Sequence, residues 1–388
     1  MTILEVDSRE PTLHGVNAGD PGGLLSTVET RRVLMVAGGT GGHVFPALAV
    51  AEELRSRQRA ARRYAVEFLG TRRGLDTRLL SRTGFPFRTI SGAGLKGVRG
   101  LRRMQNLLVL PRSAIETALV LRELQPDVVF GMGGYIAGPA MLEAALRDIP
   151  TLLLEPNALP GFTNRVLAPV VRLAAVGFED AARYYGVKAR VTGHPVRKAF
   201  FEIPPRDHQP PFTVLIFGGS QGARALNTCV LRALPLMAKR AAPWRLIHQT
   251  GEQDYNEVRK AYQDQSFDAE VCAFIEDMPA AFARADVIVS RAGANSVAEL
   301  AAAGKAAVLI PFPDAADQHQ LENARTLERV GAAHVIEQKD LTPERLVAVL
   351  ERLLDSPVEL KTMEQRARTL AHPDAAARIA DLIEELAR

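Results

Sequence analysis

Two stretches determine the predicted fold: VLMVAGGTGGH at residues 33–43 and VLIFGGSQGAR at residues 214–224. Each begins with apolar residues typical of a buried strand, breaks into a glycine-rich turn and continues into a sequence that favours a helix. A strand, a glycine turn and a helix in this order form the ligand-binding unit of doubly wound α/β domains. Two copies predict an α/β protein of two doubly wound, Rossmann-like domains that face each other across a cleft.

Composition narrows the class of protein. The chain has 388 residues, of which 47% are hydrophobic, enough for two cores of ordinary size. Cys229 and Cys272 are the only cysteines and lack metal-ligand spacing, which favours a reducing compartment and predicts no metal. No apolar stretch reaches the roughly 18 residues of a membrane-spanning helix. The 48 basic and 44 acidic residues are interspersed, so we expect no nucleic-acid partner.

Short apolar runs alternate with amphipathic stretches in both halves, as parallel sheets covered by helices require. Residues 1–30 lack periodicity and predict a flexible extension. Domains are expected at 31–196 and 197–372, joined near residues 193–205, and a final helix at about 373–388 could pack on either. The expected strands are 33–37, 65–69, 127–130, 151–154, 213–217, 245–249, 286–289 and 306–310. The expected helices are 44–58, 74–83, 137–146, 222–238, 253–263, 295–303 and 318–330.

The first glycine loop predicts an anion site. Its glycines, Gly38, Gly39, Gly41 and Gly42, surround Thr40 between a strand and a helix, where backbone amides can converge on a pyrophosphate. A second cluster, GMGGYIAG at 131–138, ends another strand of the same half, and two such loops define a crevice. The alternative is that the glycines only make tight turns. A nicotinamide site fits less well, because the G-x-G-x-x-G spacing and the later acidic residue are both missing.

Six segments in this order resemble the bacterial MurG family: GGTGGHVFPALAVAEEL, GMGGYIAGP, EPNALPGFTNR, GHPVR, GGSQGAR and SRAGANSVAELAAAGKAAVLIPFPDAADQHQLENA. Enzymes of this family transfer N-acetylglucosamine from UDP-N-acetylglucosamine to the 4-hydroxyl of undecaprenyl-pyrophosphoryl-MurNAc-pentapeptide (lipid I), giving lipid II for peptidoglycan. The resemblance runs from about residue 31 to the end. It implies a GT-B architecture with an acceptor-binding first domain, a donor-binding second domain and a last helix that returns to the first. It also implies inverting transfer without a metal or cofactor.

The resemblance, together with side-chain chemistry, assigns the donor site. Ser220 contacts the diphosphate, and Arg197 offers a planar, permanently charged group to phosphate oxygens, although a lone arginine is also a common surface charge. Glu299 accepts hydrogen bonds from the ribose hydroxyls. Alternatively, Ser296 and Glu299 form an S-x-x-E capping box. The remaining donor-site residues are Thr40, Gly41, Gly42 and Asn157, Ile275 through its backbone at uracil, and Gln320 at the transferred sugar.

The acceptor side and the catalytic base come from the first domain. His43, which has an ordinary pKa near 6.5, is the expected general base, and an orienting role is the alternative. Glu155 is expected to be either a second candidate base or an orienter of His43. The acceptor-binding residues implied by the resemblance are Gly38, Gly39, Gly133, Gly134, Tyr135 and Asn164.

One basic and apolar segment predicts membrane contact. Between residues 94 and 112, apolar residues recur at helix-like intervals beside cations, a pattern that suits anionic inner-leaflet lipid. The alternative is a helix packed on its own core. We expect a peripheral protein on the cytoplasmic face of the plasma membrane, with other cell-wall and division proteins as further partners. The proposed contact residues are Leu95, Lys96, Arg99, Arg102 and Arg103.

Two other functions are compatible with the same fold. One is a UDP-sugar 2-epimerase or hydrolase, which needs neither the first glycine loop nor the basic apolar segment. The other is a non-catalytic membrane scaffold for cell-wall enzymes.

Overall fold

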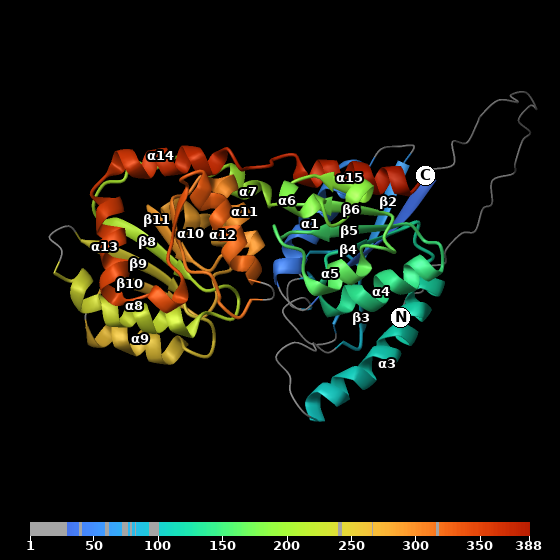
Figure 1. Cartoon of the computed structure of the whole chain (residues 1–388), viewed down its shortest axis with the longest axis horizontal. Coiled ribbons are helices and arrows are strands. Elements are labelled where there is room, and N and C mark those ends of the chain that lie inside the picture. Colours follow the sequence, from blue (N-terminus) through green and yellow to red (C-terminus); the bar gives the residue numbers. More distant parts are fainter. Residues whose placement is uncertain are drawn as a thin grey trace, which may run out of the picture.

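The computed structural model describes residues 29–38, 41–58, 62–71, 77, 80–81, 83–92, 101–239, 243–265, 267–315 and 318–388, with only the backbone at 41, 62 and 101–110. These residues form two parallel sheets, one from each half of the chain (Figure 1). The predicted extension lies outside the described residues except at its end, where the first strand begins at Glu29. Most of the helix expected at 74–83 also lies outside them.

The first sheet has the order β3-β2-β1-β4-β5-β6-β7. Its strands are β1 (Glu29–Val36), β2 (Arg62–Thr71), β3 (Phe87–Ile90), β4 (Val128–Gly131), β5 (Thr151–Glu155), β6 (Leu173–Val176) and β7 (Ala189–Val191). Because β1 pairs with both β2 and β4, the chain changes direction across the sheet beside β1. Ligands of doubly wound proteins bind at such a switch point, beyond the carboxyl ends of the strands. Both glycine clusters of the first half begin there.

Helices cover both faces of this sheet because alternate residues of β1 point to opposite sides. Val33 and Met35 pack with α1 (Gly41–Ser56) and α15 (Ala375–Leu386), whereas Leu34 and Val36 pack with α3 (Leu101–Leu124), α4 (Gly134–Leu146) and α5 (Phe162–Leu167). The last helix of the chain thus lies on the first sheet, in contact with α1. No helix within the described part of the chain is long and apolar enough to cross a bilayer.

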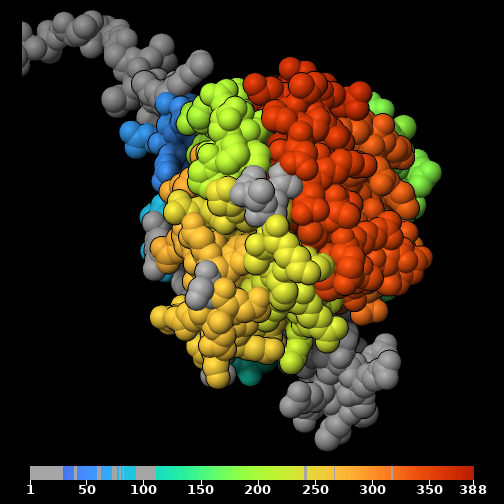
Figure 2. All heavy atoms as spheres, turned by 90° about the vertical axis from the view of Figure 1, so that its left-hand side faces the viewer, coloured from blue at the N-terminus to red at the C-terminus, as the bar shows by residue number. Residues whose placement is uncertain are grey.

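The second sheet has the order β10-β9-β8-β11-β12-β13 and repeats this switch between β8 and β11. Its strands are β8 (Phe212–Phe217), β9 (Trp244–Gln249), β10 (Ala269–Cys272), β11 (Val287–Ser290), β12 (Ala307–Leu309) and β13 (Ala333–Val335). One face carries α8 (Arg224–Met237), α9 (Tyr255–Asp264), α13 (Pro343–Leu354) and α14 (Pro357–Arg368). The other carries α7 (Lys198–Phe201), α10 (Met278–Arg284), α11 (Ala294–Ala303) and α12 (His319–Arg329). Figure 2 shows the outer end of this half, built from the regions of α8 and α9 and of α13 and α14.

The chain crosses between the halves twice, after β7 and again between α14 and α15 (Figure 1). The two crossings lie against each other, because a Cβ on Gly193 would be 2.3 Å from Cγ of His372. Gly193 also has a φ of 79°, a backbone conformation that favours glycine. We call the junction of these two crossings the hinge, because they are the covalent connections between the halves.

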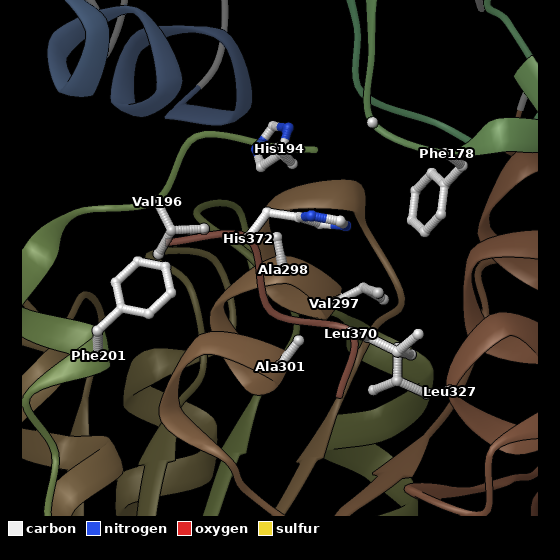
Figure 3. Close-up of a pocket in the computed structure, with 11 residues that line it drawn as sticks. Phe178, His194, Val196, Phe201, Val297, Ala298, Ala301, Leu327, Leu370 and His372 are labelled. Atoms are coloured by element: carbon white, nitrogen blue, oxygen red, sulfur yellow. The ribbon is translucent and has the colours of Figure 1, made fainter. Parts of the chain in front are cut away.

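A small cavity opens at this hinge (Figure 3). The side chains of His194 and His372 lie next to each other above α11, with Phe178 to one side and Phe201 to the other. Nε2 of His194 lies 2.6 Å from Oδ1 of Asn295, and burial lowers the pKa of His194 to about 4. The cavity therefore contains a neutral imidazole, and its lining includes none of the residues predicted to bind ligands, although Val196 and Ala298 adjoin Arg197 and Glu299 in the chain.

Candidate active site

His43 joins the first glycine loop to the helix that follows it. The loop runs from β1 into α1, whose first turn includes Gly41 and the exposed Gly42, while Gly39 and Thr40 lie outside the described residues. Nδ1 of His43 is 3.1 Å from the carbonyl oxygen of Gly38. Since a carbonyl only accepts, Nδ1 carries the proton and Nε2 carries the basic lone pair. Burial lowers the pKa of His43, although the Gly38 carbonyl raises it, so the ring is neutral at neutral pH.

The second glycine loop lies against the same histidine. Gly133 and Gly134 have φ angles of 82° and 77°. A Cβ on Gly134 would lie 3.0 Å from Cε1 of His43, and a Cβ on Gly133 would lie 2.7 Å from Oδ1 of Asn164. Tyr135 follows directly at the start of α4. The structure therefore brings His43 and the described residues expected at the acceptor into one cluster at the carboxyl edge of the first sheet.

Glu155 ends β5 with a side chain that is fully buried. Its Oε1 accepts hydrogen bonds from the backbone N–H (2.9 Å) and side-chain amide (3.1 Å) of Asn157. Its Oε2 accepts from Nδ2 of Asn164 at 2.8 Å and from the N–H of Gly161 at 3.2 Å. Burial raises the pKa of Glu155. These contacts orient Asn157 and Asn164 and shape the loop between β5 and α5.

That loop binds the second half of the chain directly. Asn323 of α12 is fully buried, and its Oδ1 accepts from the N–H of Ala158 at 3.1 Å. Its Nδ2 donates to Oδ1 of Asn157 at 3.1 Å. Asn323 lies about one helical turn after Gln320, so this amide joins the Glu155 loop to the helix that begins at the expected sugar site.

Arg197 and Glu299 lie together between the halves. Nη2 of Arg197 is 3.7 Å from Oε1 of Glu299, and the guanidinium lies 4.6 Å from the ring centroid of Phe45 in α1. Burial raises the pKa of Glu299 to about 7, although Arg197 lowers it. The two charges are therefore only partly neutralised by each other, and both could turn to the phosphates and hydroxyls of a nucleotide.

The glycine loop after β8 uses its glycines in different ways. Gly219 has a φ of 92° and open space where a Cβ would stand, and Ser220 is exposed beside it. The glycine pattern of this loop also suggests an exposed amide at Gly222, but its N–H instead donates to the carbonyl of Gly219 at 3.0 Å. A Cβ on Gly222 would lie 1.9 Å from the carbonyl oxygen of Thr250. Gly222 is thus required by packing, and Gly219 and Ser220 remain available to a diphosphate.

Gln249, which the sequence analysis did not identify, connects this loop to Ile275. The side chain is almost completely buried at the end of β9, donates to the carbonyl of Gly219 at 2.9 Å and accepts from the N–H of Ile275 at 2.8 Å. The N–H of Ile275 is thereby occupied, so the expected backbone contact with uracil would have to use its carbonyl. The only signal in the sequence is a polar residue that closes an apolar strand.

The alternative capping box is not present at α11. The residue that caps this helix is Gly293, and Ser296 lies inside the first turn. Asn227 of α8 is also buried, and its Nδ2 donates to the carbonyl of Thr250 at 2.9 Å and to Oδ2 of Asp254 at 2.8 Å. Glu299 is therefore not held by the helix terminus.

Gln320 lies in the first turn of α12, where Oε1 accepts from the N–H of Phe312 at 3.0 Å. Its amide oxygen is therefore already occupied, so the expected contact with a sugar hydroxyl would have to use the amide nitrogen. Within the described residues, no cluster of three or more His, Cys, Asp or Glu side chains could hold a metal ion.

The predicted membrane segment is described only in part. Leu95, Lys96 and Arg99 lie outside the described residues, and Arg102 and Arg103 are helical in backbone at the start of α3. Further along α3, Ile115 and Leu119 are 62% and 58% exposed. Leu142 and Leu146 of the adjacent α4 are also exposed, so large apolar side chains face outward on two helices that contact each other.

Comparison with known proteins gives matches over nearly the whole chain. Residues 33–176 match the glycosyltransferase family 28 N-terminal domain, and residues 213–379 match the C-terminal domain of that family. The UDP-N-acetylglucosamine–N-acetylmuramyl-(pentapeptide) pyrophosphoryl-undecaprenol N-acetylglucosamine transferase of Solibacter usitatus is 46% identical over 92% of this chain and 96% of its own.

Solved structures show the same architecture. The crystal structure of Acinetobacter baumannii MurG has a TM-score of 0.71 and 35% identity and covers 92% of this chain and 99% of its own. UDP-GlcNAc 2-epimerase from Neisseria meningitidis, bound to UDP-GlcNAc, has a TM-score of 0.65 but only 16% identity, over 91% of this chain and 100% of its own. The second likeness concerns the fold alone.

Proposed function

This chain belongs to glycosyltransferase family 28, and we propose that it transfers N-acetylglucosamine from UDP-N-acetylglucosamine to lipid I, giving lipid II. The acceptor is undecaprenyl-pyrophosphoryl-MurNAc-pentapeptide, and the attacking group is its 4-hydroxyl. The observation that carries this proposal is the 46% identity, over nearly the full length of both chains, to a transferase of that name.

The donor is assigned to the carboxyl edge of the second sheet. Gly219 and Ser220 receive the diphosphate together with Arg197, the carbonyl of Ile275 meets uracil, and Glu299 accepts hydrogen bonds from the ribose. The support is the pairing of Arg197 with Glu299 at 3.7 Å between the halves. A bound nucleotide gives each charge a partner of its own, and an arginine holds phosphate oxygens with paired hydrogen bonds. The proposed donor site also includes Ser296, Gln320, Asn157 and residues 40–42.

The acceptor is assigned to the two glycine loops around His43. The proposed contacts are Gly38, Gly39, Gly133, Gly134, Tyr135 and Asn164. In the reaction, Nε2 of His43 takes the proton of the 4-hydroxyl, the oxygen bonds to the anomeric carbon, and the bond from that carbon to UDP breaks. Arg197 and the amides of the second-half glycine loop stabilise the charge that develops on the departing diphosphate. The support for His43 as the base is its neutral ring with the lone pair on Nε2.

The finer location is also proposed. We place the chain on the cytoplasmic face of the plasma membrane, held by residues 95–103 and the outward-facing apolar side chains of α3 and α4. Ile115 and Leu119 provide apolar surface, and the preceding cations provide attraction to anionic lipid. Such a position suits an enzyme whose acceptor is anchored in lipid, and it would give cell-wall and division proteins access to the other half.

Release of UDP tests the reaction. The protein is incubated with UDP-N-acetylglucosamine, with and without a lipid-linked muramyl acceptor, and the products are separated. Acceptor-dependent UDP and a disaccharide-bearing lipid are the expected result. Acceptor-independent formation of the 2-epimer or of free sugar would instead support the epimerase or hydrolase. Nucleotide binding without any turnover, with a lipid acceptor shown to be active by another transferase, would support the scaffold.

A further inference from the structure

Arg291 is a buried arginine for which neither the fold nor the proposed chemistry has given a role. It follows β11 directly and is only 7% exposed. Its Nη1 donates to the carbonyls of Ile310 and Pro311, both at 3.1 Å. Its Nη2 donates to Oε1 of Gln338 at 2.6 Å. One side chain therefore ties the loop after β12 to the loop after β13.

The charge of Arg291 is held by neutral groups. Among the described residues, no carboxylate lies within ion-pair distance of it, and the ring of Phe312 lies 5.3 Å from the guanidinium carbon. Burial lowers the pKa of Arg291 to about 10, so the group is still charged at neutral pH. A buried cation without an anionic partner is unfavourable for stability, and an apolar side chain could fill this space more cheaply. The arrangement thus points to a role beyond packing.

The loop that Arg291 holds contacts Gln320, the residue expected to bind the donor sugar. Phe312 directly follows the two bound carbonyls, and its N–H donates to Oε1 of Gln320 at 3.0 Å. A side-chain amide can turn over and exchange its donor for its acceptor unless a neighbour fixes it. The Phe312 N–H fixes Gln320 with its nitrogen outward only while the loop is held in place. The loop also borders a cavity of about 120 Å³, lined by Phe312, Leu321 and Gln338, into which it could shift.

We propose that Arg291 is a positioning residue that fixes the amide of Gln320 and thereby determines which donor sugar is accepted. Its guanidinium spans the carbonyls of one loop and the Gln338 side chain of the next, and this span keeps the Phe312 N–H in contact with Gln320. The inference rests on the proposed function, because it requires that Gln320 binds the sugar of the donor.

The test compares the affinities of the full chain for UDP, UDP-N-acetylglucosamine and its 4-epimer UDP-N-acetylgalactosamine by calorimetry. The variants are Arg291→Met, Arg291→Lys and Gln320→Ala. Arg245→Met is the matched control, since Arg245 lies near the amino-terminal edge of the same sheet. We expect the dissociation constant of Arg291→Met for UDP to lie within twofold of the parent's. The ratio of its dissociation constants for the two nucleotide sugars should fall about tenfold. Arg291→Lys should recover only part of this discrimination, because lysine keeps the charge but cannot span both loops.

The outcomes separate a positioning role from a structural one. The proposal would be overturned if Arg291→Met lost the same affinity for UDP and for both nucleotide sugars. It would also be overturned if Arg291→Met kept the parent's discrimination while Gln320→Ala lost it. If Gln320→Ala itself binds both sugars as the parent does, the sugar role of Gln320 fails instead. The double variant should lose no more discrimination than Gln320→Ala alone. Should Arg291→Met not fold, Gln338→Leu removes one anchor of the guanidinium and must reduce discrimination in the same direction.

Discussion

Glu155 and His43 are two candidate bases in one cluster, and their surroundings differ. The oxygens of Glu155 accept hydrogen bonds from the loop after β5 and from Asn164, within a fully buried site. His43 is only half-buried, on the surface where the two glycine loops meet. A general base must reach the proton that it removes. The geometry therefore supports an orienting role for Glu155 and a catalytic role for His43.

The substitutions His43→Ala and Glu155→Gln distinguish these roles. Loss of a general base slows turnover about 100-fold to 10,000-fold and removes the acid limb of the pH profile of kcat, which should lie below pH 6.5 because burial lowers the pKa of His43. Glu155→Gln places an amide nitrogen against N–H donors, which costs about 2 kcal/mol of unfolding free energy or more. Its residual turnover should keep the acid limb. The measurements are kcat against pH and urea unfolding, with the exposed Glu270→Gln as control.

The sequence indicated which groups of residues lie near one another but did not indicate the buried side chain that connects two of the predicted positions. The clusters that place His43 beside Gly134 were recognisable because glycines repeat at strand ends. Gln249, which bridges Gly219 and Ile275, was not, because a single glutamine after an apolar run has no distinctive pattern. Its function depends on which strand lies next to β9, and that neighbour is fixed only by the tertiary fold.

Among the secondary-structure elements, the strands also differ in how well the sequence predicts them. Central strands such as β8 are completely buried, and their apolar runs identified most of them. The four edge strands β3, β7, β10 and β13 are short and largely half-exposed, and all four were missed, as was the short, fully buried β6. Exposed edge strands carry mixed polar and apolar residues and resemble loops in sequence.

The predicted membrane segment, residues 95–103, enters α3 at Leu101 and is expected to bind anionic lipid. Replacing Lys96, Arg99, Arg102 and Arg103 together by glutamine should weaken binding to vesicles that contain anionic lipid, since each cation near the surface contributes about 1 kcal/mol. Binding is measured by vesicle sedimentation at fixed ionic strength. The control is the corresponding replacement of four half-exposed cations of the other half, Arg245, Arg284, Arg345 and Arg352. Equal weakening in both variants would show that only net charge matters.

A buried charged cluster attaches the segment after the first crossing to the second half of the molecule. Asp286 accepts from the backbone N–H of Thr213 at 2.7 Å and from Nε of Arg206 at 3.0 Å. His208 lies 3.1 Å from Asp286 and 3.3 Å from Glu364 of α14. These contacts join the segment that follows the first crossing to α14, the helix that precedes the second crossing.

This cluster makes stability depend on pH. Burial alone would lower the pKa of His208, but Asp286 and Glu364 outweigh it and raise the pKa to about 9. The folded state therefore binds the proton more tightly than the unfolded chain. The resulting stabilisation, on the order of 3 kcal/mol, is fully present below pH 6.5 and is lost as pH rises through 9. Unfolding free energies from urea titrations between pH 6 and 8 should show the onset of this decline. Above pH 8 the buried Lys305, whose pKa burial lowers to about 8, makes stability rise with pH and so opposes it.

The matched variants assign the decline to His208. His208→Gln removes the titrating group and should give a flatter stability curve over that range. His334→Gln, which changes a half-exposed histidine of the same half, should keep the parent's slope. An unchanged slope in His208→Gln would assign the pH dependence to another group.

The contact between Gly193 and His372 brings both covalent connections between the lobes to one point. Any side chain larger than hydrogen at position 193 would press on His372 and displace one connection against the other. Such a substitution would therefore change how the two lobes sit relative to each other without replacing a residue that is proposed to bind substrate.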